Sequence, residues 1–395
     1  MKTLRESLLD YDMAMLRAIA EQLQIPLETN IQKEAVDHLA LELSKPEVVG
    51  KALALLSSEE REALDNLIRW GGKAQVAFFT RRYGPIRPFG PGKLARERPW
   101  ENPASPAEKL WFLGMIFKGF EVTETGLVEV VYIPEDLLSL LPSPAPLEET
   151  FPVEVAAEPA RKSKAEPYLT EALFLYLVYL QKEPVQPVYE LELPDAAKEA
   201  LVEIFKKRKV WPPIWADLLL PCVHSVALSL GLVRVESGFI KPHPDYVRPW
   251  LKASQWERLT GIWQAWLDNL NWNELWELPA LRCEDTGWRN DPRLARRRIV
   301  SFLSRCPEEQ WISLDSFVAA IKEVEPDFQR PDGNYNTWYI RDPTTGQYLM
   351  GFEHWEQVEG ALIRFILTGP LHWIGVMELG WDEGEAPVSF RLSPI

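Results

Sequence analysis

Apolar residues recur with helical spacing along most of this chain. In residues 8–23 they fall close to a period of 3.6, and the pattern returns in residues 35–43 and 169–180. The last of these stretches is apolar on nearly every side, which predicts a helix at the centre of its domain. Proline and glycine interrupt the pattern, as at Pro26 and Gly71, and predict where the helices end.

Three apolar helix ends run into a glycine and then into two short β-like stretches. The copies are Trp111-Phe-Leu-Gly114-Met-Ile, Ala227-Leu-Ser-Leu-Gly231-Leu-Val and His372-Trp-Ile-Gly375-Val. Glycine suits the residue after a helix because it adopts positive φ without steric cost. In the third copy, Gly369-Pro370 is expected to end the helix earlier. The order helix, loop, helix, hairpin predicts an α+β fold, mainly α with small β-hairpins, arranged as a tandem winged-helix array.

Proline density and these repeats divide the chain into four segments. Residues 1–141 are expected to form an N-terminal helical module and the first winged helix. In residues 142–167, six prolines alternate with acids and small residues, which predicts an extended or disordered linker. Residues 168–249 are expected to form a second winged helix. Residues 250–395 are expected to form a third winged-helix-like domain with Trp-rich insertions.

Charge and composition narrow the functional classes. The net charge of −15 argues against a protein held on nucleic acid by bulk charge, so such contacts must come from local basic patches. Cys222, Cys283 and Cys306 lie far apart, which favours free thiols over a zinc site or disulfides. No apolar run reaches 18 residues and the N-terminus lacks a signal-peptide core, so we expect a cytoplasmic protein without membrane contact.

No catalytic arrangement is recognisable in the sequence. Gly90-Pro-Gly-Lys93 lacks the spacing, the following Ser or Thr and the preceding strand of a phosphate-binding loop. The five histidines are scattered, and none has a nearby Ser, Cys or acid that implies a triad or a metal site. We therefore expect no enzymatic activity, no cofactor, no metal and no small-molecule substrate.

The loop from Arg81 to Trp100 is the strongest candidate for a binding site. It contains six basic residues, one acid and interleaved aromatic residues. Arginine can bind phosphate with two hydrogen bonds and exposed rings can stack on bases, so the pattern favours a nucleic-acid contact. The alternative is that the arginines neutralise acidic surroundings and the aromatic side chains pack beneath the loop. The candidate residues are Arg81, Arg82, Arg87, Lys93, Arg96, Arg98 and Trp100.

Two further basic clusters lie on predicted helices. Arg293, Arg296 and Arg297 share one face, which predicts a patch that contacts phosphate or pairs with neighbouring acids. The four basic residues 206–209 end another predicted helix. Cations at a helix C-terminus complement the helix dipole, and the alternative role is a contact with nucleic acid. The presumed recognition helix, residues 105–116, is mostly apolar, whereas helices that read the major groove present polar side chains.

Three stretches carry a family resemblance. They are Leu56-Ser-Ser-Glu-Glu-Arg-Glu-Ala-Leu with Gly71-Gly72, Tyr83-Gly84 with Arg98-Pro-Trp100 and Leu110-Trp-Phe-Leu-Gly114, and Gly369-Pro-Leu-His-Trp-Ile-Gly375. They resemble a bacterial family of helicase-associated, multi-winged-helix proteins related to the N-terminal region of XPB-type helicases. The resemblance implies association with nucleic-acid machinery, such as a helicase or another DNA-processing protein.

Two functions remain open from the sequence. The first is a non-enzymatic protein that binds DNA, or attaches to helicase or transcription machinery, through its basic patches. The second is a protein-interaction scaffold of winged-helix modules without nucleic-acid contact, which uses Trp-rich surfaces. The candidate tryptophans for that surface are Trp272, Trp276, Trp288, Trp338 and Trp355. Arginines that face solvent would favour the first function, and arginines paired with acids the second.

Overall fold

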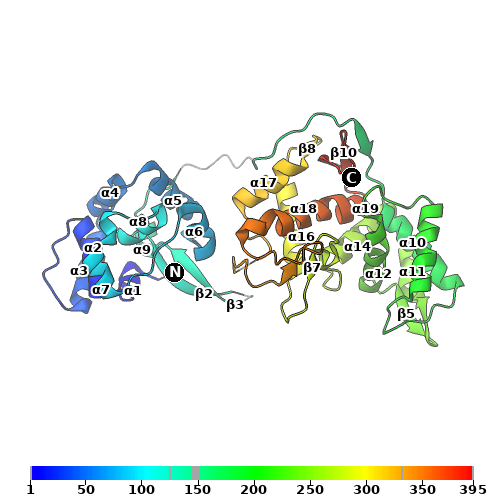
Figure 1. Cartoon of the computed structure of the whole chain (residues 1–395), viewed down its shortest axis with the longest axis horizontal. Coiled ribbons are helices and arrows are strands. Elements are labelled where there is room, and N and C mark those ends of the chain that lie inside the picture. The colour runs from blue at the N-terminus through cyan, green and yellow to red at the C-terminus, as the bar shows by residue number, and fades with distance from the viewer. Residues whose placement is uncertain (1, 124–125, 145–150, 331, 394–395) are drawn as a thin grey trace. The chain divides into compact units, whose positions relative to one another are not determined.

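The computed structural model of the chain describes residues 2–123, 126–144, 151–330 and 332–393 (Figure 1). It divides into two compact units, one containing residues 1–149 and 331–334 and the other residues 150–330 and 335–395. Helices predominate, and the described strands form small antiparallel sheets, so the fold is α+β. No helix among the described residues has the length and apolar character needed to span a membrane.

The first unit begins with four helices. They are α1 (Leu4–Leu8), α2 (Met13–Gln22), α3 (Gln32–Leu43) and α4 (Pro46–Ala54). Asp12 caps α2 by accepting a hydrogen bond from the N–H of Met15, and Pro46 occupies the first turn of α4, where its missing N–H costs nothing. Leu16, Ile19 and Leu39 are fully buried, so this helical module shares one core with the elements that follow it.

A short strand precedes the second helix in the remainder of the first unit. The elements are α5 (Ser58–Arg69), β1 (Lys73–Gln75), α6 (Val76–Tyr83), α7 (Pro91–Glu97), η1 (Pro99–Glu101), α8 (Pro106–Phe112), β2 (Phe117–Thr123), β3 (Gly126–Tyr132) and α9 (Glu135–Leu138). The sheet order is β1-β3-β2, with Ala74 opposite Val131. The order is therefore helix, strand, helices and hairpin, and the first strand pairs with the last.

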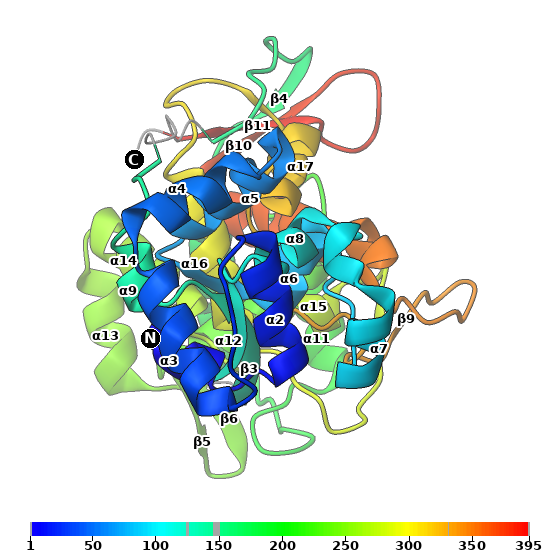
Figure 2. The same ribbon diagram turned by 90° about the vertical axis from the view of Figure 1, so that its left-hand side faces the viewer.

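Helix α8 starts where the sequence predicts and has little free surface. Ser105 accepts a hydrogen bond from the N–H of Glu108, and Pro106 takes the first helical position. The helix packs against α2, α5 and α6 (Figures 1 and 2). Ala107, Leu110 and Phe112 have no solvent exposure. The N-terminal module thus covers the helix that the sequence marks as the presumed recognition helix.

The boundary between the two units falls inside the predicted linker, after residue 149, but residues 151–167 pack onto the second unit and are not a free linker. Phe151 is buried and stacks on Phe302 with ring centroids 5.3 Å apart. Val155 forms an antiparallel bridge with Ile312, and β4 (Arg161–Ser163) pairs with a strand near the C-terminus. Prolines between these contacts do not prevent pairing because the segment lies at the edge of a sheet. Residues 145–150 of the predicted linker lie outside the described residues.

The second unit repeats the element order seen in the first. The elements are α10 (Tyr168–Lys182), α11 (Asp195–Lys207), η2 (Ala216–Leu218), α12 (Leu219–Ser229), β5 (Val233–Glu236), β6 (Phe239–Pro242) and α13 (Pro244–Lys252). Val185, between α10 and α11, bridges to Ile240 of β6. The predicted boundary between residues 249 and 250 does not separate compact units, because one core continues from α10 to the C-terminal sheet.

The remaining elements contain the same order a third time. They are α14 (Gln255–Leu267), α15 (Glu274–Glu277), β7 (Arg282–Cys283), α16 (Pro292–Leu303), β8 (Ile312–Ser313), α17 (Leu314–Val324), β9 (Ile340–Arg341), η3 (Phe352–His354), η4 (Glu356–Gly360), α18 (Ala361–Ile366), η5 (Leu367–Leu371), α19 (His372–Ile374), β10 (Met377–Trp381) and β11 (Ser389–Leu392). Sheet order β4-β10-β11-β8 pairs β8 with the second hairpin strand. This copy therefore starts at α16, not directly after Pro249 as the sequence suggests.

The three glycine junctions have one shared geometry, as their sequences predict. Gly114, Gly231 and Gly375 have φ values of +66°, +65° and +95°. After each glycine, the next N–H bonds to the carbonyl five residues earlier, at 3.0 Å, 2.9 Å and 3.2 Å. The predicted helix end at Gly369-Pro370 is wrong, because the helix continues through the π-helical turn η5. A wider turn accommodates a proline that has no N–H to donate.

Candidate functional site

In the basic loop, the guanidinium of Arg87 binds a buried carboxylate. Arg87 donates to Glu108 at 2.8 Å and 2.7 Å, and the N–H groups of Arg87 and Ala104 donate to the same carboxylate. The Glu108 side chain has no solvent exposure. Burial alone would raise the pKa of Glu108, but the Arg87 and backbone hydrogen bonds outweigh it and lower that pKa. Arg87 therefore ties the loop to α8.

The other basic residues of the loop also lie beside acids or on the helix before it. Arg98 pairs with Glu21 and Glu101. Lys93 and Arg96 lie 3.8 Å and 3.3 Å from Glu97, and Arg82 lies 3.9 Å from Glu62. Arg81 is half-buried at the end of α6. Each exposed pair contributes little stability, about 0–1 kcal/mol, but together they neutralise much of the charge that suggested a phosphate contact.

The aromatic residues of the loop face the core, which corrects the role proposed for Trp100. Trp100 is 6% exposed and meets Phe112 edge-on, with ring centroids 6.5 Å apart. Tyr83 is also buried, and its hydroxyl accepts a hydrogen bond from Asn66. A ring in this position cannot stack on a base. The neutralising and packing alternative therefore describes this loop.

Arg296 is a structural residue and not a phosphate ligand. Its side chain has no solvent exposure and pairs with Glu274 through two contacts of 2.8 Å. The same guanidinium donates to the carbonyls of Trp266, Asn269 and Trp272 at 2.7 Å, 2.6 Å and 2.5 Å. It thus joins α14, α15 and α16, and all its donor groups are used inside the protein.

The two other candidate arginines of α16 are paired at the surface. Arg293 binds Asp291, the residue that caps the helix, at 3.0 Å and 2.7 Å. Arg297 pairs with Asp268 at the end of α14. The three arginines lie on the predicted helix but do not form the predicted patch on one face, because Arg296 is buried and each arginine meets a different carboxylate. The exposed candidate arginines of this helix, Arg293 and Arg297, are therefore both paired with acids of the same unit.

The tryptophans proposed as a partner surface are mostly buried, which corrects that prediction. Trp272, Trp338 and Trp355 are 2%, 9% and 0% exposed, and Trp276 and Trp288 are half-buried. Trp288 stacks on Trp338 and meets Trp276 at a tilt of 35°, with ring centroids 5.3 Å and 5.1 Å away. These rings fill the core around the long insertion, where large side chains bury the most apolar area.

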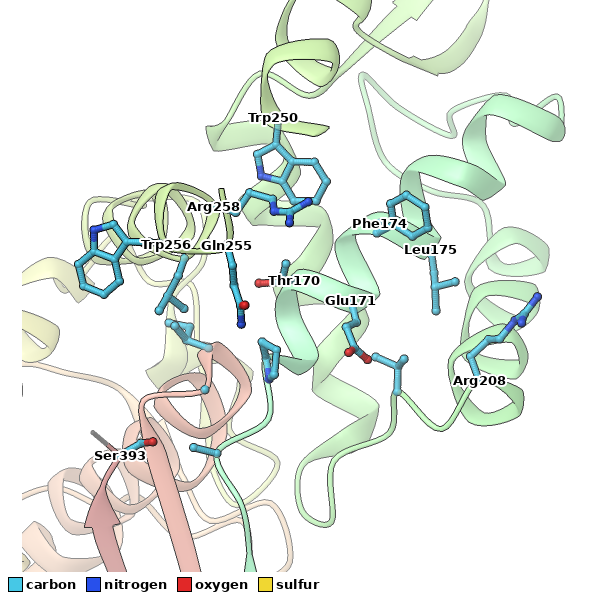
Figure 3. A pocket seen from close by; sticks show the side chains of 16 residues that line it. Thr170, Glu171, Phe174, Leu175, Arg208, Trp250, Gln255, Trp256, Arg258 and Ser393 are labelled. Carbon is cyan, nitrogen blue, oxygen red and sulfur yellow. The ribbon is translucent and has the colours of Figure 1, made fainter. Parts of the chain in front are cut away.

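A hollow of the second unit lies elsewhere, along α10. It has a volume of about 870 Å³ and is bordered by α10, α13, α14 and the residues after α11. Figure 3 shows Phe174 and Leu175 of α10, Trp250 of α13 and Trp256 of α14 around it. Phe174 is 47% exposed and Trp256 is 60% exposed. Two smaller hollows, of about 270 and 320 Å³, share α10 residues with it. We name these three hollows together the α10 groove.

The cations of the α10 groove differ from those of the basic loop. Arg208 and Arg258 border its largest hollow, and neither forms an ion pair within the part of the chain that the structure describes. The guanidinium of Arg258 lies over the ring of Trp250, 5.7 Å from its centroid. Within the described residues, Arg258 Nε and Trp250 Nε1 are buried donors without an acceptor.

The sequence contained a signal for this groove that its interpretation missed. Apolar residues occur on nearly every face of α10, whereas a helix at the surface of a protein needs only one apolar face to pack on the core. The prediction that α10 is central holds for its buried side, which includes Leu173 and Tyr176. Its other side, with Phe174 and Val178, lies in the groove. An excess of apolar positions can therefore mark a binding surface as well as a central helix.

The first unit has a smaller exposed apolar surface on its hairpin. Phe120, Val122 and Leu127 are 70%, 81% and 67% exposed. Val122 and Leu127 lie opposite each other in the β2–β3 register, and Phe120 is two residues from Val122 on the same face of β2. Three large apolar side chains on one strand face form a patch of the kind that proteins use for contacts with other proteins.

The cysteines lie in apolar surroundings. Burial raises the pKa of Cys283 and of Cys306 to about 12 and raises that of Cys222 further, so these thiols stay protonated near neutral pH. The described part of the chain contains no cluster of three or more His, Cys, Asp or Glu side chains suited to a metal ion.

Comparisons with family models, curated proteins and solved structures gave no match for the chain.

Proposed function

We propose that this protein is a non-enzymatic scaffold of three winged-helix modules that binds a partner protein through exposed apolar surfaces. The modules extend from α5 to β3, from α10 to β6 and from α16 to β11. The element order supports this assignment, since in each module an extended segment after the first helix pairs with the second hairpin strand. The shared glycine geometry before each hairpin supports it further.

The helices that would read DNA are covered in all three modules. Helix α8 packs against α2, α12 packs against α14, and most residues from α18 to α19 are buried. A recognition helix must present polar side chains to base edges in the major groove. These helices instead contribute residues such as Phe112, Val223 and Phe365 to the core. Their burial favours modules that serve as packing and contact units.

One observation carries the proposal. Most basic residues that could bind DNA are paired with acids, whereas several large apolar side chains are exposed to solvent. The basic residues of α16 and those of the loop from Arg82 to Arg98 lie beside carboxylates, whereas Phe174, Trp256 and the hairpin patch are exposed. Aromatic residues and arginine are enriched at protein–protein interfaces. The sequence resemblance to helicase-associated proteins makes a DNA-processing protein the partner class we propose. Direct DNA binding through the basic loop is the alternative.

A salt titration of DNA binding distinguishes the two functions. Labelled single- and double-stranded 20-residue DNA would be titrated with the protein at about 50 to 200 mM salt, the range over which phosphate contacts weaken strongly. The variant has Arg81, Arg82, Arg96 and Arg98 changed to Ala. The matched control variant also loses four cations, because Lys33, Lys51, Lys164 and Arg282, all outside the basic loop, are changed to Ala.

We expect no saturable fluorescence-anisotropy change for any of the three proteins at the lowest salt concentration. Binding that weakens steeply with salt, with a shallower slope in the loop variant than in the control variant, would overturn the proposal. That result would place phosphate contacts on the basic loop and favour the DNA-binding alternative.

A further inference from the structure

We propose that the α10 groove binds an acidic, amphipathic segment of a partner protein. Apolar side chains of this segment would contact Phe174 and Trp256, and its carboxylates would face Arg208 and Arg258. This inference rests on the proposed function, because it names the chemistry of the partner for one surface of the scaffold.

The groove offers an apolar floor that the fold leaves uncovered. Phe174, Leu175 and Val178 of α10 line it, and Val247 and Leu251 of α13 extend it past the end of the largest hollow. Apolar side chains exposed to water raise the free energy of the folded protein, and a partner that covers them lowers it again. The groove residues on α10, Thr170 to Lys182, cover about 18 Å at a rise of 1.5 Å per residue. That length suits about three turns of a partner helix.

Charge complementarity identifies the segment as acidic. The groove is bordered by four cations, Arg208, Arg258, Lys182 and Lys207, and by two carboxylates, Glu171 and Glu183. The whole chain carries a net charge of −15, so this local excess of positive charge is opposite in sign to the charge of the chain as a whole. Within the described residues none of the four cations forms an ion pair, so carboxylates of a partner would meet cations that no internal acid neutralises.

The buried donors beside Trp250 give a separate reason to expect an oxygen-rich ligand. Arg258 Nε and Trp250 Nε1 have no acceptor within the described residues, and both side chains border the largest hollow. Both atoms are covered by protein atoms, so a carboxylate or a backbone carbonyl of a partner would accept from them only after these side chains shift, and it would then remove the cost of leaving buried donors unpaired. The donors thus lie where the apolar floor and the cations meet.

A protein segment fits these features better than single-stranded nucleic acid. Proteins that bind single strands provide successive aromatic platforms along a basic channel. Here the floor between Phe174 and Trp256 is largely aliphatic, with Leu175 and Leu259, and Glu171 lies among the lining residues. Aliphatic side chains pack with the apolar side chains of a peptide helix, whereas they offer successive bases no aromatic platform for stacking.

The test selects ligands without assuming a sequence. A displayed library of random 16-residue peptides would be selected on the full-length protein, and the enriched peptides would be synthesised for binding measurements by fluorescence anisotropy. We expect enriched peptides with large apolar residues three or four positions apart and with an excess of Asp and Glu. A single-stranded oligothymidylate of 20 residues would be measured beside them.

Substitutions in the groove then locate the binding. We expect Phe174→Ala with Trp256→Ala, and separately Arg208→Glu with Arg258→Glu, to weaken peptide binding by about tenfold or more. The matched controls are Tyr189→Ala and Arg282→Glu, which change an exposed aromatic residue and an exposed cation outside the groove. Unchanged thermal unfolding of each variant would show that the fold is intact.

Three results would overturn this inference. They are enriched peptides without acidic residues, peptide binding that is insensitive to both groove variants, and oligothymidylate binding that the groove variants abolish. Peptides that bind elsewhere would leave the scaffold function in place and refute only the groove assignment. Nucleic-acid binding at the basic loop would instead refute the scaffold function, so the two failures can be told apart.

Discussion

The basic loop and the α10 groove both combine cations with aromatic rings, but their surroundings differ. In the loop, Arg87 and Arg98 meet carboxylates, and Trp100 is buried. In the groove, Arg208 and Arg258 form no ion pair within the described residues, and Trp256 is 60% exposed. The density of basic residues in the sequence therefore did not show which cations remain without an ion pair in the folded protein. What decides availability is whether folding brings an acid to each cation.

The largest expected effect concerns Arg296, the buried arginine of α16. Changing Arg296 to Met should lower the free energy of unfolding of the second unit by about 3–5 kcal/mol, because Glu274 would remain buried without its partner. The neighbouring Arg297→Met should cost about 1 kcal/mol or less, since its pair with Asp268 is exposed. Urea unfolding measures both variants. Equal losses would contradict the distinction between buried and surface arginines of this helix.

The aromatic rings of the two regions should differ nearly as much. Trp100→Ala should destabilise the first unit by about 3 kcal/mol, because it leaves a cavity against Phe112. Trp256→Ala should change stability by about 0.5 kcal/mol or less, because the ring is mostly exposed. Thermal and urea unfolding of the two variants give the comparison. A tolerated loss of Trp100 would show that its ring is available at the surface.

A smaller effect should appear at acidic pH through Glu108. Its pKa is lower in the folded protein than the ordinary value of 4.5, so its contribution to stability is full above pH 4.5 and is lost as pH falls through the lowered pKa. Wild type should therefore lose stability below pH 4.5 more steeply than Glu108→Gln, which we expect to be about 2 kcal/mol less stable at neutral pH. The exposed Glu59→Gln is the control. Parallel pH profiles for wild type and Glu108→Gln would contradict the paired carboxylate.

Much of the local structure could be predicted because its causes are local. Ser57, Ser105 and Ser313 cap the helices that follow them, and glycine ends the apolar helices before the hairpins. The segment of residues 151–167 was mispredicted because its partners, such as Phe302 and Ile312, lie more than a hundred residues away. Proline density describes the segment alone and contains no information about those partners.

The candidate site was harder to predict for the same reason. Glu108 is 21 residues from Arg87, and Glu21 is 77 residues from Arg98, so a short stretch of sequence contains only one member of either pair. Glu97 and Glu101, by contrast, lie close in sequence to the cations that they meet. The groove likewise combines Phe174, Arg208 and Trp256 from three separate helical regions. The sequence did mark α10 as apolar on too many sides, but only packing shows which side remains uncovered.

Arginine reactivity tests the central claim most directly. Limited phenylglyoxal modification of the folded protein, followed by mass spectrometry, compares the rates at individual guanidinium groups. We expect Arg208 and Arg258 to react faster than Arg87 and Arg98, and Arg296 to react only after unfolding, because carboxylates and burial protect the latter residues. Faster reaction at Arg87 and Arg98 than at Arg208 and Arg258 would contradict the claim that the loop cations are neutralised and the groove cations are accessible. The basic loop would then be the favoured binding surface.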